Sequence, residues 1–281
     1  MEGLPTTRLL ISCPDRPGLI ASVSGFLAER GLNIVDLDQH SSEGRLFMRA
    51  EFDAATPEDR DRVYAEFQEQ IAGPAEMDHH FAETTPQKRM AIMVSREDHC
   101  LSDLLWRWRN GELDGELLMV ISNHDVHRGQ VEGFGVPFHH LPVAPGEKEA
   151  TEQAALELLG GIDVLVLARY MQILSADFLE RLGAPAINIH HSFLPAFVGA
   201  DPYQRAHERG VKLIGATAHY VTADLDAGPI IEQDVTRVSH RDEAEDLKSI
   251  GRDAERMVLA RAVKAHLGDR VLLDGARTVV F

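Results

Sequence analysis

Three side chains suited to acyl-group chemistry occur between residues 188 and 226. Asn188 and His190 flank Ile189 in a short apolar segment, and Asp226 precedes an Ala-Gly-Pro turn sequence. Because side chains alternate along a β-strand, Asn188 and His190 share one face, and His191 points the other way if the strand continues. An amide and an imidazole can donate hydrogen bonds to a developing oxyanion, and a carboxylate can fix an attacking nucleophile and accept its proton. These residues predict acyl-transfer chemistry.

The region around these residues alternates between strands and helices. We expect strands at 90–94, 116–122, 138–141, 164–168 and 186–190, and helices at 102–109, 127–134, 147–159, 175–181 and 253–267, before a hairpin of 271–273 and 278–281. Apolar strands separated by helices are typical of a doubly wound, mostly parallel α/β sheet. Ligands bind such sheets beyond the carboxyl ends of the strands, which is where Asn188 and His190 lie.

The first 84 residues predict a separate, smaller domain. We expect strands at 9–12, 33–40, 46–52 and 77–81, a helix opened by Pro17-Gly18 and ended at Gly31, and a second helix at 57–71. Two βαβ-like halves of this size form a ferredoxin-like α+β sandwich. The segment 84–88 is polar and contains Pro86, so we expect domains of residues 1–84 and 85–281.

Composition excludes several classes of function. The net charge is −17, with 28 basic and 45 acidic residues, which argues against nucleic acid as a partner. The two cysteines, Cys13 and Cys100, lack metal-ligand spacing and favour a reduced, cytoplasmic environment. The longest apolar run, 164–168, is too short to cross a bilayer. No His-Glu-x-x-His motif occurs, and we expect no metal.

Two sets of motifs carry a resemblance to known families. The sequence Cys-Pro-Asp-Arg-Pro-Gly-Leu at 13–19, with Gly-Leu-Asn-Ile at 31–34, resembles the ACT domain, a regulatory module that commonly binds amino acids. Asn-Ile-His-His-Ser-Phe-Leu-Pro-Ala-Phe at 188–197, Gly-Ala-Thr-Ala-His-Tyr-Val at 215–221 and Leu-Asp-Ala-Gly-Pro-Ile-Ile at 225–231 resemble the catalytic domain of folate-dependent formyltransferases. In this form they look like those of the formyltetrahydrofolate deformylases, and the resemblance covers essentially the full chain.

The resemblance implies a reaction and a set of site residues. It implies hydrolysis of 10-formyltetrahydrofolate to formate and tetrahydrofolate, which supplies formate for purine synthesis and balances one-carbon pools, with Asn188, His190 and Asp226 catalytic. The expected substrate-binding residues are Tyr170, Met171, Gln172, Ile173, Leu174, Thr217, His219, Leu225 and Gly228. The expected effector residues are Asp15, Arg16, Gly18, Leu19 and Asn33. It also implies an amino-acid effector, a homo-oligomer and no permanently bound cofactor.

Two alternatives remain, both weaker. The same trio could transfer the formyl group to an amine such as glycinamide ribonucleotide, but enzymes for that phosphate-bearing acceptor place a Gly/Ser-rich loop after the first strand. Here the segment 95–100 reads Ser-Arg-Glu-Asp-His-Cys, with two acids and no glycine. The second alternative, a non-catalytic amino-acid-responsive regulator, is disfavoured by the intact trio. One departure is that deformylases usually carry His-Gln where this chain has Gln204-Arg205.

The division of proton transfer stays open at this point. A carboxylate with an ordinary pKa of about 4 is a weak base at neutral pH. Either burial raises the pKa of Asp226, or His190 shares the proton transfer. We expect His191 to pack away from the site, and His219 to line it or to support the trio.

Overall fold

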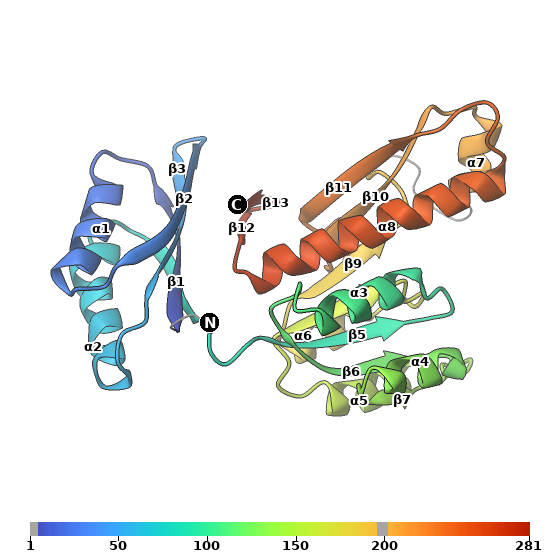
Figure 1. Ribbon diagram of the computed structural model, residues 1–281, viewed down its shortest axis with the longest axis horizontal. Coiled ribbons are helices and arrows are strands. Elements are labelled where there is room, and N and C mark those ends of the chain that lie inside the picture. Colours follow the sequence, from blue (N-terminus) through green and yellow to red (C-terminus); the bar gives the residue numbers. More distant parts are fainter. Residues whose placement is uncertain (1–4, 196–201) are drawn as a thin grey trace. The chain divides into compact units, whose positions relative to one another are not determined.

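The computed structural model describes residues 5–195 and 202–281 (Figure 1). Ala196 and Phe197, which end the 188–197 motif, lie outside the described residues. Contacts divide the chain into two compact units. Unit 1 contains the chain up to Gln87 together with 268–274 and 278–281, and unit 2 contains Lys88–Leu267 with 275–277. The division near residue 87 lies close to the expected boundary, but most of the C-terminal hairpin groups with unit 1 and not with unit 2 as expected.

Unit 1 is an antiparallel sheet of four strands in the order β2-β3-β1-β4, with its helices packed on one face (Figure 1). Its elements are β1 (Thr6–Pro14), α1 (Leu19–Glu29), β2 (Ile34–Ser42), β3 (Arg45–Asp53), α2 (Pro57–Phe67), a π-helical turn η1 (Gln68–Ala72) and β4 (Asp78–Glu83). Leu9 and Ile11 alternate with more exposed residues along β1 and pack against Val23 and Phe26 of α1. The predicted ferredoxin-like α+β sandwich is confirmed.

The C-terminal segment attaches to the sheet of unit 1 through arginines. It contains the two-stranded sheet of β12 (Val271–Asp274) and β13 (Arg277–Val280). The arginine contacts are Arg49 to the carbonyl oxygen of Gly268 (3.2 Å), Arg8 to Asp269 (3.2 Å), and Arg270 to Asp36 and Asp38 (2.9 and 3.0 Å). This hydrogen bond and these ion pairs link residues distant in sequence, so local sequence patterns could not predict where this segment packs.

Unit 2 is a seven-stranded sheet in the order β11-β10-β9-β8-β5-β6-β7. Its strands are β5 (Arg89–Val94), β6 (Glu116–Ser122), β7 (Phe138–His140), β8 (Val164–Ala168), β9 (Ala186–His190), β10 (Leu213–Tyr220) and β11 (Ile230–Arg237). The five strands from β9 to β7 pair in parallel, and β10 and β11 extend the sheet in antiparallel fashion. The predicted doubly wound, mostly parallel sheet is confirmed.

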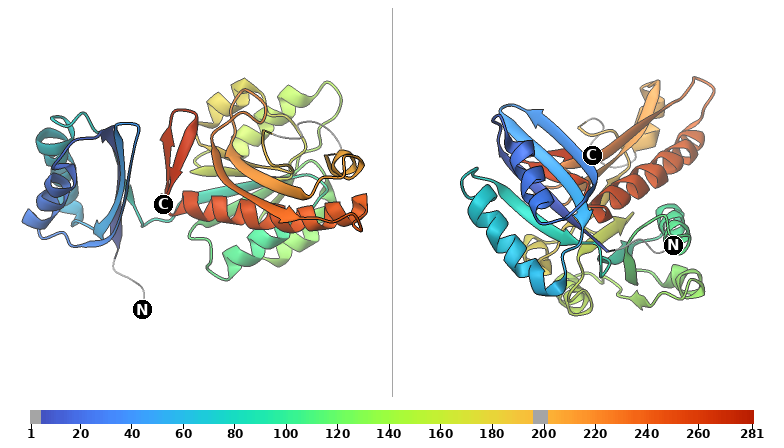
Figure 2. Two further views of the ribbon diagram at one scale, coloured as in Figure 1. Left: turned by 90° about the horizontal axis from the view of Figure 1, so that it is seen from above. Right: turned by 60° about the vertical axis from the view of Figure 1, so that its left-hand side comes forward.

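Helices cover both faces of this sheet. They are α3 (His99–Arg109), the short η2 (Asp125–His127), α4 (Arg128–Gly133), α5 (Lys148–Leu158), α6 (Ala176–Leu182), α7 (Pro202–Glu208) and α8 (Ala244–Leu267). The helices α3 and α8 lie on one face, and α5 and α6 on the other (Figure 2). Burial on both faces explains why the central strands are continuously apolar.

The start of α8 differs from the prediction. The helix begins at Ala244, whereas the expected helix began at residue 253, after Gly251. A glycine inside a helix is unfavourable by about 1 kcal/mol relative to alanine, so it signals a break in the sequence pattern. In the structure a Cβ at this position would lie 2.1 Å from the hydroxyl oxygen of Tyr203. Gly251 therefore stays inside the helix to admit the tyrosine ring.

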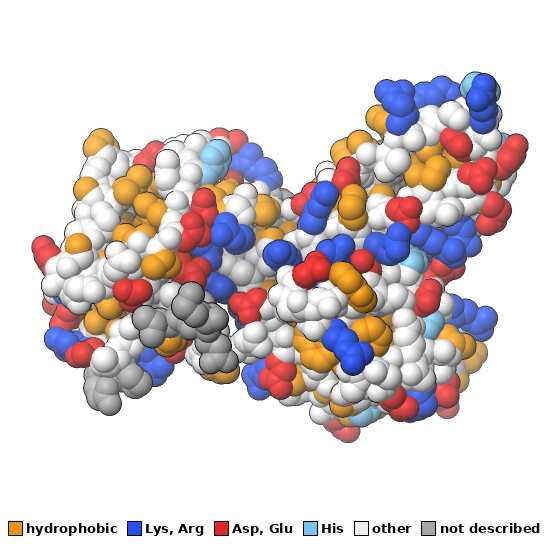
Figure 3. Space-filling model, viewed as in Figure 1, with side chains coloured by type: hydrophobic (Ala, Val, Ile, Leu, Met, Phe, Trp, Pro, Cys, Tyr) orange, Lys and Arg blue, Asp and Glu red, His pale blue; other side chains and the backbone are white. Residues whose placement is uncertain are grey.

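The surface is mixed in charge, as the dispersed acidic residues predict. On the face drawn in Figure 3, acidic and basic side chains are interspersed over both units. Among the described residues, no helix has the length and apolar character needed to cross a membrane.

Candidate active site

A pocket of about 320 Å³ opens at the carboxyl ends of β8 and β9. The residues that line it are Leu167, Arg169 to Leu174, Asn188 to His191, His219, Val221 to Ala223, Leu225 and Asp226. Met171, Ile173 and Leu225 are each more than half exposed, so an apolar rim surrounds polar groups that lie deeper. Large exposed apolar side chains around a cavity are typical of a ligand site.

The loop after β8 is held in place by Ser95, the residue that follows β5. The Ser95 hydroxyl accepts a hydrogen bond from the Met171 backbone N–H (2.9 Å) and donates one to Oδ1 of Asn123 (2.8 Å). The Ser95 backbone N–H also donates to the Arg169 carbonyl (3.2 Å). Burial raises the pKa of Tyr170 in this loop to about 12, so its hydroxyl stays neutral. These bonds fix the wall of the pocket at which we expected the folate ring.

Asn188 and His219 meet because β9 and β10 pair in antiparallel register, which places the two residues opposite each other. Nδ2 of Asn188 lies 3.3 Å from Nε2 of His219, and Nδ1 of His219 lies 2.8 Å from the Tyr220 carbonyl oxygen. A carbonyl oxygen only accepts, so Nδ1 of His219 carries a proton. Nε2 of His219 also lies 3.7 Å from Oδ1 of Asp226, so it accepts from the Asn188 amide in the neutral ring and donates to the carboxylate in the protonated ring. In either form at least one amide N–H of Asn188 is left for a ligand in the pocket.

His190 and Asp226 form a close pair. Nδ1 of His190 lies 3.2 Å from Oδ2 of Asp226, and both side chains are largely buried. The hydrogen bond from His190, with a further contribution from His219, holds the pKa of Asp226 well below its ordinary value, although burial acts in the opposite direction. Asp226 is therefore ionised at neutral pH. The lowered pKa disfavours the alternative in which burial raises it and favours the alternative in which His190 shares the proton transfer.

The His190 ring lines the pocket, and its far nitrogen is unpaired within the described part of the chain. Its Nε2 is buried and has no hydrogen-bond partner among the residues that the structure describes. An unpaired buried nitrogen is costly, by about 1–3 kcal/mol, and such atoms in native sites need a functional reason. Because the ring lines the pocket beside Asn188, Nε2 is a candidate for proton exchange with a bound molecule.

Two of the expected substrate-binding residues are not among the residues that line the pocket. Thr217 is fully buried, and its hydroxyl accepts from the Leu194 N–H (3.0 Å) and donates to the Ser192 carbonyl (2.9 Å), which fixes the loop after β9. A Cβ on Gly228 would lie 1.8 Å from the Tyr220 carbonyl oxygen, so only glycine lets this turn pack on the end of β10. Both residues act on the site by shaping the loops that carry it.

Sequence reasoning missed the two basic side chains of the pocket that lie beside the predicted residues, His191 and Arg169. The expectation that His191 points away was wrong, because β9 ends at His190 and the alternation of a strand stops there. The His191 ring instead lines the pocket and stacks on His190, with ring centroids 5.1 Å apart and planes at 20°. Arg169 also lines it. Its position directly after a buried parallel strand could have identified it, because ligands bind beyond the carboxyl ends of such strands.

The expected effector residues surround the loop between β1 and α1. Asp15 and Asn33 are exposed, and Arg16 donates to the Pro74 carbonyl (2.8 Å). Gly18 adopts a left-handed conformation (φ 93°) before α1, and Leu19 is a buried core residue. The side chain of Leu19 thus belongs to the core, and an effector site at this loop stays a prediction.

Comparisons with known proteins agree with this architecture. A family described as formyl transferase matches residues 88–263, and the ACT domain family matches residues 7–66. A formyltetrahydrofolate deformylase of Mycobacterium bovis is 56% identical over 283 residues, covering 98% of this chain and 90% of that protein. This chain belongs to the formyltetrahydrofolate deformylase family. The resemblance seen in the sequence motifs is thereby confirmed.

Solved structures give the same assignment. A crystal structure of a formyltetrahydrofolate deformylase from Pseudomonas syringae pv. tomato has a TM-score of 0.94 and 51% identity, and the match covers 100% of this chain and 96% of that one. Glycinamide ribonucleotide transformylase 1 from Symbiobacterium toebii has a TM-score of 0.66 and 30% identity, covering 69% of this chain and 94% of that one. The deformylase family therefore shares part of its chain with formyl transferases.

Proposed function

We propose that this protein hydrolyses 10-formyltetrahydrofolate to formate and tetrahydrofolate. Membership of the deformylase family supports the reaction. The observation that carries the assignment to this pocket is the His190–Asp226 pair, whose unpartnered Nε2 lies on a pocket also lined by Asn188. These groups supply what addition of water to a formyl carbon requires: a proton carrier and a donor for the oxyanion.

In the proposed mechanism Asn188 binds the formyl oxygen. Its second amide N–H donates to this oxygen, and the bond strengthens as the oxygen becomes negative in the tetrahedral intermediate. The other N–H is engaged with His219, which holds the amide in orientation. Removal of one such donor typically lowers the rate by about 10²–10³-fold.

His190 carries the proton from water to the leaving nitrogen. Nδ1 of His190 donates to ionised Asp226, so the lone pair on Nε2 accepts a proton from water as its oxygen bonds to the formyl carbon. The imidazolium formed is stabilised by Asp226. It then returns the proton to N10 of the folate as the carbon–nitrogen bond breaks, which releases formate and tetrahydrofolate. The low pKa of Asp226 suits this role, since a weak base stays charged throughout.

Transfer of the formyl group to a phosphate-bearing amine has less support. The sequence argument held that Glu97 and Asp98 repel phosphate. The structure refines it, because Glu97 binds Arg252 of α8 (2.5 Å) and lies 3.9 Å from Lys248. The charge of Glu97 is therefore compensated by these two basic side chains. Phosphate binding is disfavoured because Arg252 and Lys248 already lie beside a carboxylate of the protein.

The decisive experiment omits every amine acceptor. The purified protein is incubated with 10-formyltetrahydrofolate alone, and the formate and tetrahydrofolate formed are measured over time. Hydrolysis gives the two products in equal amounts. We expect turnover in wild type and its loss in Asp226→Asn. Tetrahydrofolate formation that depends on added glycinamide ribonucleotide and yields the formylated amine without formate would instead identify a transferase, and no reaction under either condition would contradict both.

Other features of the protein belong to the same proposal. We infer a regulatory role for the ACT domain with an amino-acid effector, a homo-oligomer formed through that domain, and catalysis without a permanently bound cofactor or metal. A cytoplasmic enzyme that releases formate would supply purine synthesis and balance one-carbon pools. Light scattering tests the oligomer, and the formate assay with each amino acid in turn tests the effector.

A further inference from the structure

Behind the pocket lies a buried carboxylate that the proposed mechanism does not use. Glu255 is in the middle of α8, and its side chain is 1% exposed. Oε1 accepts a hydrogen bond from the Tyr203 hydroxyl (2.6 Å), and Oε2 lies 2.8 Å from Nε2 of His99 and 3.4 Å from Nε of Arg169. Burial acts to raise the pKa of Glu255, but these three partners outweigh it, and the pKa lies below its ordinary value. A buried carboxylate ion needs partners of this kind.

The helix is adapted to hold this arrangement. Gly251 lies one turn before Glu255 on α8, and any side chain there would overlap the Tyr203 ring. The fold therefore accepts a glycine inside a helix to bring the phenol to the carboxylate. This arrangement of glycine, phenol and carboxylate indicates that the fold is built to bury the charge of Glu255.

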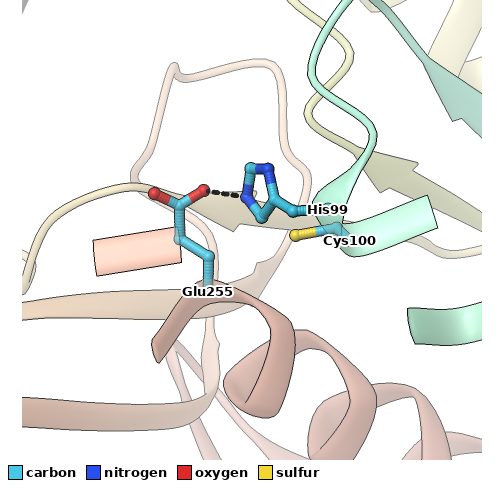
Figure 4. Close-up of side chains that lie close together, drawn as sticks. All are labelled: His99, Cys100 and Glu255. Carbon is cyan, nitrogen blue, oxygen red and sulfur yellow. Dashed lines mark hydrogen bonds and ion pairs between the residues drawn. The ribbon is translucent and has the colours of Figure 1, made fainter. Parts of the chain in front are cut away.

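A metal ion is the first alternative for this cluster. His99, Cys100 and Glu255 have ligand atoms within 4.8 Å of one another, and Figure 4 shows the imidazole of His99 bonded to the carboxylate. Burial raises the pKa of the Cys100 thiol well above its ordinary value, which disfavours the thiolate that binds metals. The guanidinium of Arg169 adds a positive charge beside Glu255. The residues present disfavour a cation and point to Arg169 as the charge that Glu255 balances.

Arg169 connects this carboxylate to the active site. While Nε of Arg169 faces Glu255, Nη1 lies 2.6 Å from Nδ1 of His191. An arginine is always protonated and donates, so Nδ1 of His191 accepts and the proton of the neutral ring resides on Nε2. Burial, followed by the charge of Arg169, lowers the pKa of His191 to about 4. His191 is thus fixed in one tautomer and stacked on His190.

We propose that Glu255 is a positioning residue for the hydrolytic reaction: by holding Arg169 it fixes His191 against His190, in the tautomer with its proton on Nε2. This inference rests on the proposed function. The stack restrains the plane of the His190 ring, which must keep Nδ1 on Asp226 while Nε2 faces the substrate. A neutral His191 also avoids a second positive charge beside the His190 imidazolium that forms during the reaction.

The test begins with Glu255→Gln, which preserves volume and removes the charge that holds Arg169. We expect kcat for formate release to fall about 10- to 100-fold, as is typical for groups that orient catalytic side chains. The KM for 10-formyltetrahydrofolate should change less than about threefold, because the apolar wall of the pocket is untouched. The matched control is Arg256→Gln, the next residue of α8, which is half-exposed and pairs with Asp253. It should retain wild-type kcat.

A double-mutant cycle separates positioning from general damage. Glu255→Gln and Arg169→Gln act through one path in this proposal, so the double variant should have a kcat no more than about threefold below the worse single variant. Removing both charges also avoids leaving one buried charge unpaired, so the double variant folds if Glu255→Gln alone does not. Multiplication of the two single effects, or full activity in Glu255→Gln, would overturn the proposal.

A spectroscopic measurement makes the test independent of turnover. In protein with ¹⁵N-labelled histidine, the signal lost in His191→Gln identifies His191, and in wild type it should show the neutral Nε2–H tautomer from pH 8 to pH 5.5. In Glu255→Gln it should move toward a mixture of tautomers. An unchanged signal there would overturn the role of Glu255, whereas absence of formate release by wild type would contradict only the proposed function.

Discussion

Asn188 and His219 face each other across β9 and β10, with the amide nitrogen 3.3 Å from Nε2 of the imidazole. His219 in turn donates from Nδ1 to the Tyr220 carbonyl, the same oxygen that Gly228 packs against. The orientation of the Asn188 amide is therefore linked to the turn that follows Asp226. The antiparallel pairing places Asn188 opposite His219, and the loop after β10 carries Asp226.

The first prediction concerns the oxyanion donor. Asn188→Ala removes both amide N–H groups, and we expect kcat for formate release to fall about 10²–10³-fold. The KM should change little, because the bond strengthens in the transition state and not in the bound substrate. Asn110→Ala, at the exposed C-terminal end of α3, is the control and should be fully active. A loss below about tenfold for Asn188→Ala would remove this residue from the oxyanion site.

The second prediction concerns the carboxylate. Asp226→Asn is nearly isosteric but cannot accept the Nδ1 proton of His190 as an ion, and we expect kcat to fall about 10³-fold or more. Tetrahydrofolate binding, measured by calorimetry, should persist. Asp224→Asn alters an exposed acid of the same loop and should be active. If Asp226→Asn retains a tenth of wild-type kcat, the His190–Asp226 pair is not the proton carrier.

The position of the proposed trio in one pocket could be predicted because its signals are local. The alternation of a strand places Asn188 and His190 on one face, and the apolar strands of unit 2 predict their position at a carboxyl edge. The error in the prediction of the site also has a physical reason. The alternation rule gave the wrong direction for His191 because nothing in the sequence marks the end of β9 at His190.

Contacts between distant parts of the chain explain the features that could not be predicted from the sequence. Glu255 lies in a helix rich in charged residues, where a carboxylate is usually solvated, and its partners come from α3, α7 and the residue after β8. In the sequence Gly251 indicates a helix break, and only the structure shows that the Tyr203 ring packs against it. The attachment of the C-terminal segment to unit 1 depends on ion pairs between residues more than 200 positions apart, such as Arg8 and Asp269.

The third prediction tests the turn that places Asp226. In Gly228→Ala the new Cβ would lie 1.8 Å from the Tyr220 carbonyl oxygen, so the turn must move. Overpacking of this kind typically destabilises by about 1–3 kcal/mol, and kcat should fall about 100-fold or more because a displacement of about 1 Å can cost that much. Gly129→Ala, on α4, meets no atom within 4 Å, so it should keep wild-type kcat and leave the melting temperature unchanged or raised. Equal behaviour of the two variants would refute the argument.

The fourth prediction follows from the low pKa of His191, about 4 in the folded protein, against about 6.5 for an unperturbed histidine. Above pH 6.5 neither state binds the proton. Between pH 6.5 and 4 the unfolded chain binds it and the folded protein does not, so the free energy of unfolding falls as the pH falls. From pH 7 to pH 5 this amounts to about 1–2 kcal/mol, after allowance for partial exposure.

The variant His191→Gln tests this difference, because it lacks the titrating group and keeps the charged and titratable groups around the ring. These groups are Arg169, Glu255, His190, Asp226 and Tyr203. Urea unfolding of wild type and variant at both pH values measures the difference, and the variant should lose less stability by that amount. Equal losses would mean that His191 is protonated in the folded protein, and that Arg169 does not hold it neutral.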